Sequence, residues 1–492
     1  MAPPQSLWAL GALGAVLLGD RSLRGTPGGA GRSWRGRTRA EAPTRWAKRA
    51  DLAGLAVRRP VPGRVVVGRA RGRLVCLEPG QALAVVGPTQ SHKTSGLVVP
   101  ALLRWPGPVV AASVKADLVR ASLQARRRLG RVFLYDPVQV AGPGLWADGA
   151  EPVGWTPVDG ATSWAGARRL ASALASVARS RAGDLRDGDF WYQQAAKLLG
   201  PLLHAAALGG LPVTEVLRWL ETQEAEEPGA LLDAAGAWPA LQALRACWGR
   251  DDRQRSAVLA TAELVLEAYA EPGLAEGPGG PPLDPAALSA GCDSLFLCAP
   301  AHHQERLRPL FAALLGEVLA GAVDRAERHG RPLDPPLLVV VDEAANVAPL
   351  ADLDVLAATV AAHGIQLVTV WQDLAQLQAR YGPRAGTVLN NHRARLFLPG
   401  IADPATLEHA SSLAGDVERP SRTVSRDAQG RVGTAQVPQR QRLLPPDALR
   451  RLPTRQGLLI VGSRQPCRVR LVPWFDDPEL RRLARPGDEE PR

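Results

Sequence analysis

One short stretch of sequence decides the fold of this chain: Val85-Val86-Gly87-Pro88-Thr89-Gln90-Ser91-His92-Lys93-Thr94-Ser95. An apolar run at residues 82–86 leads into it, and a second apolar run at residues 96–103 follows it. This order predicts a strand, a loop and a helix. The spacing of Gly87, Lys93 and Thr94 is that of a phosphate-binding P-loop.

The residue types in this loop suit a nucleotide phosphate. Backbone N–H groups at the start of a helix bind anions, and the helix dipole favours the negative charge. We expect Lys93 to reach the β- and γ-phosphates of ATP, and we expect the Thr94 hydroxyl to be a ligand of Mg²⁺. The predicted nucleotide-binding residues are Gly87, Pro88, Thr89, Gln90, Ser91, His92, Lys93, Thr94 and Ser95.

One residue departs from the motif, because His92 stands where a glycine is expected. A side chain at this position can point away from the phosphates if the backbone φ angle is negative. We therefore expect nucleotide binding to survive. The alternative is a turn of small residues that binds nothing.

Composition and charge limit the classes of function that fit this chain. The chain has 492 residues, which is enough for two or more domains, and a formal net charge of +11. Such a basic balance favours nucleic acid or anionic lipid as a partner, although plain solubility also accounts for it. The five cysteines are scattered, odd in number and without a CxxC pair. They indicate a reducing compartment and argue against a zinc site or a disulfide framework.

The N-terminal part has a short apolar segment at residues 6–19, which is less than the roughly 20 residues that span a bilayer. Lys and Arg greatly outnumber Asp and Glu in residues 20–73. This pattern is typical of a basic stretch beside the cytoplasmic face of a membrane, and equally of a disordered basic tail.

The order of apolar runs predicts the architecture. Short apolar strands alternate with helices, which indicates a parallel α/β sheet with both faces covered. Residues 163–289 instead read as amphipathic helices, so we expect an all-α domain inserted into the α/β domain. Two hairpins are predicted, one at residues 65–77 and a polar one near residues 427–430. The expected division is 1–43 (apolar segment and basic tail), 44–162 and 290–480 (the α/β domain), 163–289 (the insertion) and 481–492 (a charged tail).

A second motif completes the predicted site. Residues 337–341 form an apolar run that ends in Asp342-Glu343, as in the second half of a P-loop ATPase. We expect Asp342 to hold Mg²⁺ and Glu343 to orient and activate the attacking water. Gln372 ends the next predicted strand, where it either senses the γ-phosphate or is an exposed strand-end residue. Such strand ends are where ligands bind in open α/β sheets.

The chain resembles type IV secretion coupling proteins of the TraG/TraD group, of an actinobacterial type. The most specific motif is Asp342-Glu343-Ala344-Ala345-Asn346-Val347-Ala348-Pro349-Leu350. The resemblance covers residues 44–475 and also includes the segments 87–94, 113–118, 189–203, 364–367, 371–374, 390–396 and 400–403.

This resemblance implies a RecA-like P-loop NTPase domain with an inserted all-α domain, assembled as a homo-hexameric ring. It implies ATP and Mg²⁺ as cofactors. The implied substrate is relaxase-bound DNA, which is expected to be single-stranded, and the implied partners are type IV secretion channel components. The N-terminus would contact the inner membrane, so the expected location is the cytoplasmic face, with the cytoplasm as the alternative. Arg393 and Arg395 are the candidates for an arginine that acts on the ATP of a neighbouring subunit.

Two alternatives to this function stay open. One is a DNA-translocating ATPase of the FtsK or HerA kind that works without a channel. The coupling-protein family usually has two membrane-spanning helices before the motor, whereas the present sequence has one short apolar segment. This difference slightly favours the alternative, and the motifs at residues 342–350 and 371–374 disfavour it. The other is a nucleotide-binding docking scaffold with little turnover, which His92 supports.

Overall fold

The computed structural model describes residues 44–139, 141–179, 188–270, 274, 280–298, 300, 302–426 and 432–485. The predicted apolar segment and basic tail at residues 1–43 lie outside these ranges, as do the polar turn at 427–430 and residues 486–492 of the charged tail. Within the described ranges, no helix combines the length and the apolar character that crossing a membrane requires. All five cysteines are free thiols.

A mixed sheet of thirteen strands forms the centre of the α/β part, in the order β1-β3-β2-β15-β14-β11-β4-β10-β9-β5-β8-β6-β7. From β11 to β7 all neighbouring strands are parallel. These are β11 (Ala394–Phe397), β4 (Leu83–Val86), β10 (Ile365–Trp371), β9 (Leu337–Val341), β5 (Val109–Ser113), β8 (Ser294–Cys298), β6 (Val132–Tyr135) and β7 (Glu151–Pro152). The apolar runs of the sequence thus become the parallel strands.

The other edge of the sheet is antiparallel, and of this edge the sequence predicted only the hairpin of β2 and β3. It consists of β14 (Gln456–Val461), β15 (Cys467–Arg470), β2 (Val66–Ala70), β3 (Arg73–Cys76) and β1 (Ala56–Val57). Short turns join β14 to β15 and β2 to β3, and short turns allow only antiparallel neighbours. The turn between β2 and β3 is Arg71-Gly72, both with positive φ, as a tight hairpin requires. The predicted hairpin at residues 65–77 is confirmed.

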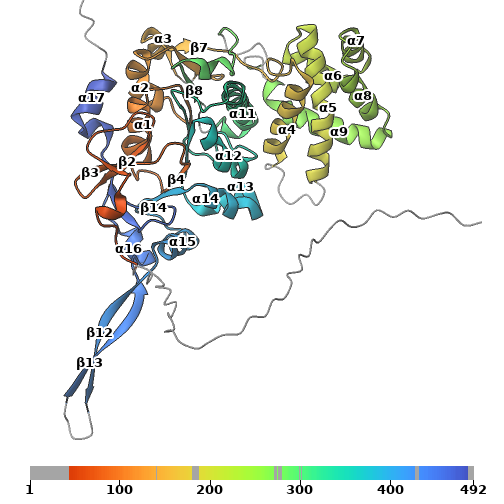
Figure 1. Ribbon diagram of the computed structural model, residues 1–492. Coiled ribbons are helices and arrows are strands. Elements are labelled where there is room, and N and C mark those ends of the chain that lie inside the picture. Colours follow the sequence, from red (N-terminus) through yellow and green to blue (C-terminus); the bar gives the residue numbers. More distant parts are fainter. Residues whose placement is uncertain are drawn as a thin grey trace, which may run out of the picture. The chain divides into compact units, whose positions relative to one another are not determined.

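Helices cover both faces of the parallel strands (Figure 1). On β9, Leu338 and Val340 pack in one core cluster with α1 (Val99–Arg104), α2 (Asp117–Arg127) and α17 (Pro478–Ala484). Leu337, Val339 and Val341 pack in another core with α11 (Gln304–His329), α12 (Leu353–Thr359), α13 (Leu374–Tyr381) and α14 (Ala385–Asn391). Because side chains alternate along a strand, a continuous apolar run buries both faces of the sheet.

Among the described residues between β7 and β8, in the region predicted to be helical, six α-helices have defined bounds. They are α4 (Trp164–Arg179), α5 (Gly188–Gly209), α6 (Val213–Glu221), α7 (Glu226–Ala234), α8 (Trp238–Trp248) and α9 (Asp252–Leu266). Helix α5 packs against α4, α7, α8 and α9. Helices α7 and α8 are separate because the chain turns at Gly236, whose φ is 66°.

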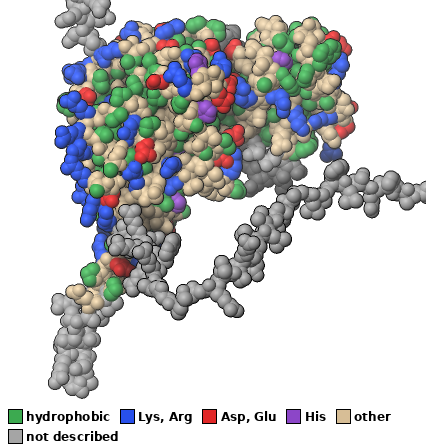
Figure 2. Space-filling model, in the orientation of Figure 1, with side chains coloured by type: hydrophobic (Ala, Val, Ile, Leu, Met, Phe, Trp, Pro, Cys, Tyr) green, Lys and Arg blue, Asp and Glu red, His purple; other side chains and the backbone are tan. Residues whose placement is uncertain are grey.

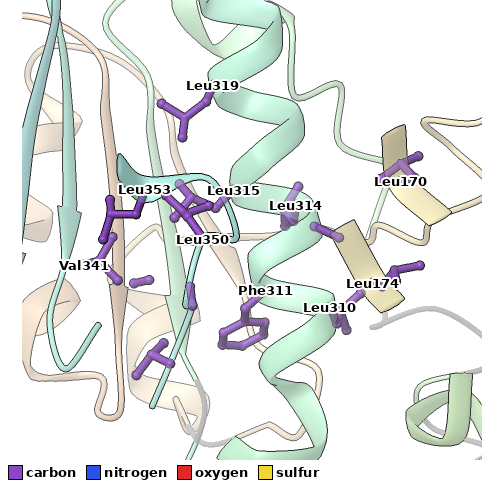
Figure 3. Packing of buried hydrophobic residues seen from close by; sticks show 14 of the residues in the cluster. Leu170, Leu174, Leu310, Phe311, Leu314, Leu315, Leu319, Val341, Leu350 and Leu353 are labelled. Atoms are coloured by element: carbon purple, nitrogen blue, oxygen red, sulfur yellow. The ribbon is translucent and has the colours of Figure 1, made fainter. Parts of the chain in front are cut away.

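Helix α11 packs between the sheet and the helical insertion. Figure 3 shows Leu315 on the side of α11 that faces Leu350 and Leu353, and Leu310 close to Leu174 of α4. The Arg169 guanidinium of α4 donates two hydrogen bonds of 2.8 Å to the Glu317 carboxylate of α11. The same helix therefore contacts the segment that follows β9 and the first helix of the insertion.

A separate two-stranded sheet follows the parallel strands. Strands β12 (Asp416–Arg426) and β13 (Val432–Arg442) pair antiparallel, from Asp416 opposite Arg442 to Arg426 opposite Val432. These strands flank the polar turn that the sequence predicted.

Candidate nucleotide-binding site

The P-loop starts where β4 ends and runs into a helix. The Gly87 N–H donates to the Trp371 carbonyl of the neighbouring strand β10 over 3.0 Å. A helical turn, η2 (Thr94–Val98), then continues into α1. A side chain at Gly87 would place its Cβ 2.8 Å from the Leu398 Cβ, which is too close for any residue except glycine. The predicted strand, loop and helix are all present.

Lys93 is a buried cation inside this loop. Its side chain is almost fully enclosed, and the Nζ donates to the Gly87 and Pro88 carbonyls, both over 2.6 Å. Burial lowers the pKa of Lys93, and the nearby carboxylates of Asp342 and Glu343 act in the opposite direction. The hydrogen-bond partners of the Lys93 Nζ are neutral carbonyls, so a phosphate that enters would gain a strong electrostatic partner.

Thr94 and Asp342 meet although 248 positions separate them in the chain. The Thr94 hydroxyl donates to the Asp342 carboxylate over 2.9 Å. Asp342 follows β9, and its own N–H donates to the Ala112 carbonyl of β5. Burial raises the pKa of Asp342 to about 6, while the Thr94 hydrogen bond and the Lys93 charge lower it. A divalent cation would stabilise this desolvated carboxylate.

Glu343 lies in a tight loop directly after Asp342. Its φ is 58°, in the left-handed region that costs a non-glycine residue about 1 kcal/mol or more. The Glu343 carbonyl accepts hydrogen bonds from the N–H groups of Asn346 and Val347, at 2.8 and 3.1 Å. The N–H of the next residue, Ala344, donates a hydrogen bond to the Val370 carbonyl of β10 over 2.9 Å. These bonds fix the backbone of Glu343 at the end of the sheet where the P-loop lies.

Gln372 also lies at this end of the sheet. It directly follows Trp371, which is opposite Val86 in the pairing of β10 with β4. Its side chain is half-buried, and its N–H donates to the Gln376 side chain over 3.1 Å. Gln372 is therefore beside the first residue of the P-loop.

The two candidate arginines are placed differently. Both lie at the start of β11, and because β11 runs parallel to β4, they lie at the end of the sheet opposite to the P-loop. Arg395 donates to the Leu389 and Asn390 carbonyls at the end of α14, at 2.8 and 3.1 Å. Arg393 is exposed. The structure does not bring either residue to the P-loop of its own chain.

His92 differs from the expectation for its backbone. Its φ is 64°, so the negative angle that would turn the side chain away from the phosphates is not adopted. The loop keeps the conformation that a glycine would have, at a cost of roughly 1 kcal/mol for an L-residue. The His92 Nδ1 lies 3.1 Å from the Ser95 hydroxyl, which holds the ring against the first helical turn.

A cavity of ≈ 610 Å³ opens along the P-loop, and its volume is in the range of small-molecule sites. Its lining contains most of the predicted loop and some residues from elsewhere: Gln90, Ser91, His92, Lys93, Thr94, Ser95, Val99, Asp117, Ala121 and Trp474. Sequence reasoning did not find Trp474, because nothing in the local pattern at residues 470–476 indicates a ligand.

The paired oxygen groups of Thr94 and Asp342 fit magnesium. Mg²⁺ is usually bound through one or two carboxylates together with substrate phosphates and water, rather than by a full set of protein ligands. Asp342 and Thr94 supply such an incomplete set of oxygens. In the described part of the chain, no cluster of three or more His, Cys, Asp or Glu residues could hold a metal.

The surface carries basic side chains beside the antiparallel strands. Figure 2 shows Lys and Arg gathered along the side formed by α17 and β3. Arg69 and Arg470 are directly opposite each other in the pairing of β2 with β15, and both are exposed. Like charges in such positions repel each other, so an anionic partner would stabilise this surface.

Comparison with known protein families gives one match over most of the chain. The family model described as "Type IV secretory system Conjugative DNA transfer" matches residues 45–486. Among curated proteins, a conjugal transfer protein TraG of Escherichia coli is 26% identical over 401 residues, which are 74% of this chain and 60% of TraG. Protein VirD4 of Agrobacterium fabrum is 23% identical over 414 residues, covering 81% of this chain and 59% of VirD4. The chain thus spans about 60% of the length of these relatives.

Solved structures show the same fold. The unbound conjugative coupling protein TrwB superposes with a TM-score of 0.66 at 20% identity, over 88% of this chain and 93% of the other. TrwB in complex with ADP and Mg²⁺ gives a TM-score of 0.65 at 19% identity, over 88% and 94% of the two chains. The likeness confirms the predicted RecA-like P-loop fold with an inserted all-α domain.

Proposed function

The chain belongs to the type IV secretory system conjugative DNA transfer family, and we propose that it is a coupling ATPase that hydrolyses Mg²⁺–ATP at its P-loop to deliver DNA to a secretion channel. The observation that carries the proposal is the 2.9 Å contact between Thr94 and Asp342. It joins the two halves of a nucleotide site that lie far apart in the sequence. The complex of TrwB with ADP and Mg²⁺ supports the same ligands for this chain.

The residues present support a simple division of roles. Gly87–Ser95 would hold the phosphates, with Lys93 exchanging its bonds to loop carbonyls for bonds to phosphate oxygens. Thr94 and Asp342 would hold Mg²⁺, which neutralises charge on the phosphates when bound. Glu343 would orient the attacking water and accept its proton. Gln372, which follows β10 beside Gly87, would report whether a γ-phosphate is present.

The wider role rests on the family together with the charge of the chain. A homo-hexameric ring at the cytoplasmic face of the membrane, with single-stranded relaxase-bound DNA and channel components as partners, is the form we propose. The net charge of +11 and the exposed arginines of β2 and β15 supply cations for DNA phosphates. An arginine acting between subunits stays a proposal, and exposed Arg393 is more available for it than Arg395.

The test is ATP hydrolysis measured with and without single-stranded DNA, for the wild type and the variant Glu343→Gln. We expect DNA to stimulate turnover. We also expect the variant to lose about 100-fold or more of the rate while it binds ATP within about threefold of the wild type.

A second measurement tests the DNA partner. Binding of single-stranded DNA should weaken steeply with salt, because the phosphates contribute much of the affinity.

Equal rates of ATP hydrolysis for Glu343→Gln and wild type would refute the catalytic site. Nucleotide binding without turnover would instead support a docking scaffold, and a DNA affinity that is independent of salt would refute DNA as the substrate.

A further inference from the structure

We propose that Trp474 is the platform on which the base of the bound nucleotide stacks. This inference rests on the proposed function, because it extends the same cavity from the phosphates to the base. Trp474 lies in the turn η7 (Trp474–Asp476), after the last strand of the sheet, far from the P-loop in sequence. Its side chain is half-buried and lines the cavity together with the P-loop.

The approach of this turn to the P-loop depends on a missing side chain. Gly96, in the first helical turn after Lys93, has no Cβ, and one built there would lie 3.0 Å from the Leu471 Cβ. The segment after β15 can therefore pass close to η2, and η7 packs against η2. A glycine at residue 96 thus brings the indole of Trp474 to the rim of the nucleotide cavity.

The turn is held in place by the two carboxylates that follow the tryptophan. Asp476 accepts from Arg455 over 2.5 Å, and Asp477 forms an ion pair with Arg104 at 3.4 Å. The Asp477 carboxylate also accepts from the Glu479 N–H over 3.0 Å and caps α17. A platform that is fixed before binding loses little entropy when a ligand arrives.

The chemistry of the cavity separates phosphates from base. Lys93 is its cation, at the P-loop, and it attracts the triphosphate. Val99, Ala121 and Trp474 give the cavity an apolar wall built from α1, α2 and η7. A nucleobase is flat, aromatic and uncharged, and stacking on an aromatic side chain stabilises it. Stacking does not read the hydrogen-bonding edge of the base, so ATP and GTP should bind with similar affinity.

Calorimetric titration with two ligands tests the platform, namely a non-hydrolysable ATP analogue and inorganic tripolyphosphate, both with Mg²⁺. Trp474→Ala should weaken binding of the ATP analogue about tenfold and leave tripolyphosphate binding within about twofold. Trp474→Phe should retain most of the affinity, because a smaller aromatic ring still stacks. The matched control is Phe475→Ala, since Phe475 is the adjacent aromatic residue, is 42% exposed and does not line the cavity.

The outcomes separate the platform from the proposed function. The platform is refuted, while the phosphate site stands, if Trp474→Ala binds the ATP analogue as tightly as the wild type does. It is also refuted if the variant's affinity for tripolyphosphate falls by the same factor as its affinity for the ATP analogue. Unchanged tripolyphosphate binding also shows that the P-loop of the variant is folded. A wild type that binds neither ligand would refute the nucleotide site itself, and the platform with it.

Discussion

Replacing Asp342 by asparagine should make the ligand-free protein more stable, although it removes a residue of the proposed site. Asp342 is 6% exposed, and burial raises its pKa from 3.8 to about 6. A pKa rise of about two corresponds to about 3 kcal/mol of unfavourable free energy for the ionised carboxylate in the folded state. Asparagine is uncharged and can still accept the hydrogen bond from Thr94. We therefore expect the unfolding free energy of Asp342→Asn to exceed that of the wild type by about 3 kcal/mol at pH 7.

The pH dependence of this difference follows from the direction of the pKa change. Between pH 4 and pH 6 the folded wild type keeps a proton on Asp342 that the unfolded chain has released. The unfolding free energy of the wild type therefore falls, relative to the variant, as the pH rises through this window. Below about pH 4 both states are protonated, so the two proteins should be equally stable. Above about pH 6.5 the difference should be constant.

Urea unfolding followed by circular dichroism, at several pH values and without nucleotide or Mg²⁺, measures this difference. The control is Asp117→Asn, an identical change at an exposed carboxylate on the same cavity, with an expected effect below about 0.5 kcal/mol. A difference for Asp342→Asn that does not vary with pH would refute the reasoning. So would a variant less stable than the wild type at pH 7.

Three further variants test other parts of the structure. His92→Gly should raise the unfolding free energy by roughly 1 kcal/mol, because the backbone at a φ of 64° already suits glycine. A loss of stability would contradict this. Unchanged nucleotide affinity and turnover would show that the histidine is neutral for function. Arg169→Gln should lower the unfolding free energy, measured with urea, by about 2 kcal/mol, because the mostly buried Glu317 carboxylate loses two hydrogen bonds. The same change at the adjacent, exposed Arg168 should lower it by less than about 0.5 kcal/mol. Lys93→Ala should weaken tripolyphosphate binding about 100-fold or more, since a buried cation is lost. The control Lys115→Ala, at an exposed lysine, should keep the affinity for tripolyphosphate within about twofold of the wild type. Equal losses in the two lysine variants would argue against the P-loop as the phosphate site.

Local sequence patterns were enough to locate both halves of the candidate site. The P-loop has a fixed spacing because backbone N–H groups must surround a phosphate, and that spacing is visible at Gly87, Lys93 and Thr94. The strand before Asp342 is visible because a strand buried on both faces needs a continuous apolar run. The helical insertion was visible for a similar reason, since amphipathic helices have a period that strands lack.

The pairing of distant segments was not visible in this way. The antiparallel edge of the sheet depends on β14 lying beside β11 and β15 beside β2, and short local patterns do not specify neighbours. The same limit applies to the two arginines. The family resemblance suggested that one of them acts on the ATP of a neighbouring subunit, and the direction of β11 puts both at the end of the sheet opposite to the P-loop of their own chain.

The sequence by itself determined the proposed chemistry of this protein, because a phosphate loop and an acidic strand end are short motifs whose residues act through local geometry. Only the tertiary structure decided which groups complete the site. It brings Thr94 to 2.9 Å from Asp342 across 248 positions, and it places Trp474 on the wall of the same cavity. The physical reason is that sheet order and the close approach at Gly96 arise from packing between distant segments, which no local pattern encodes.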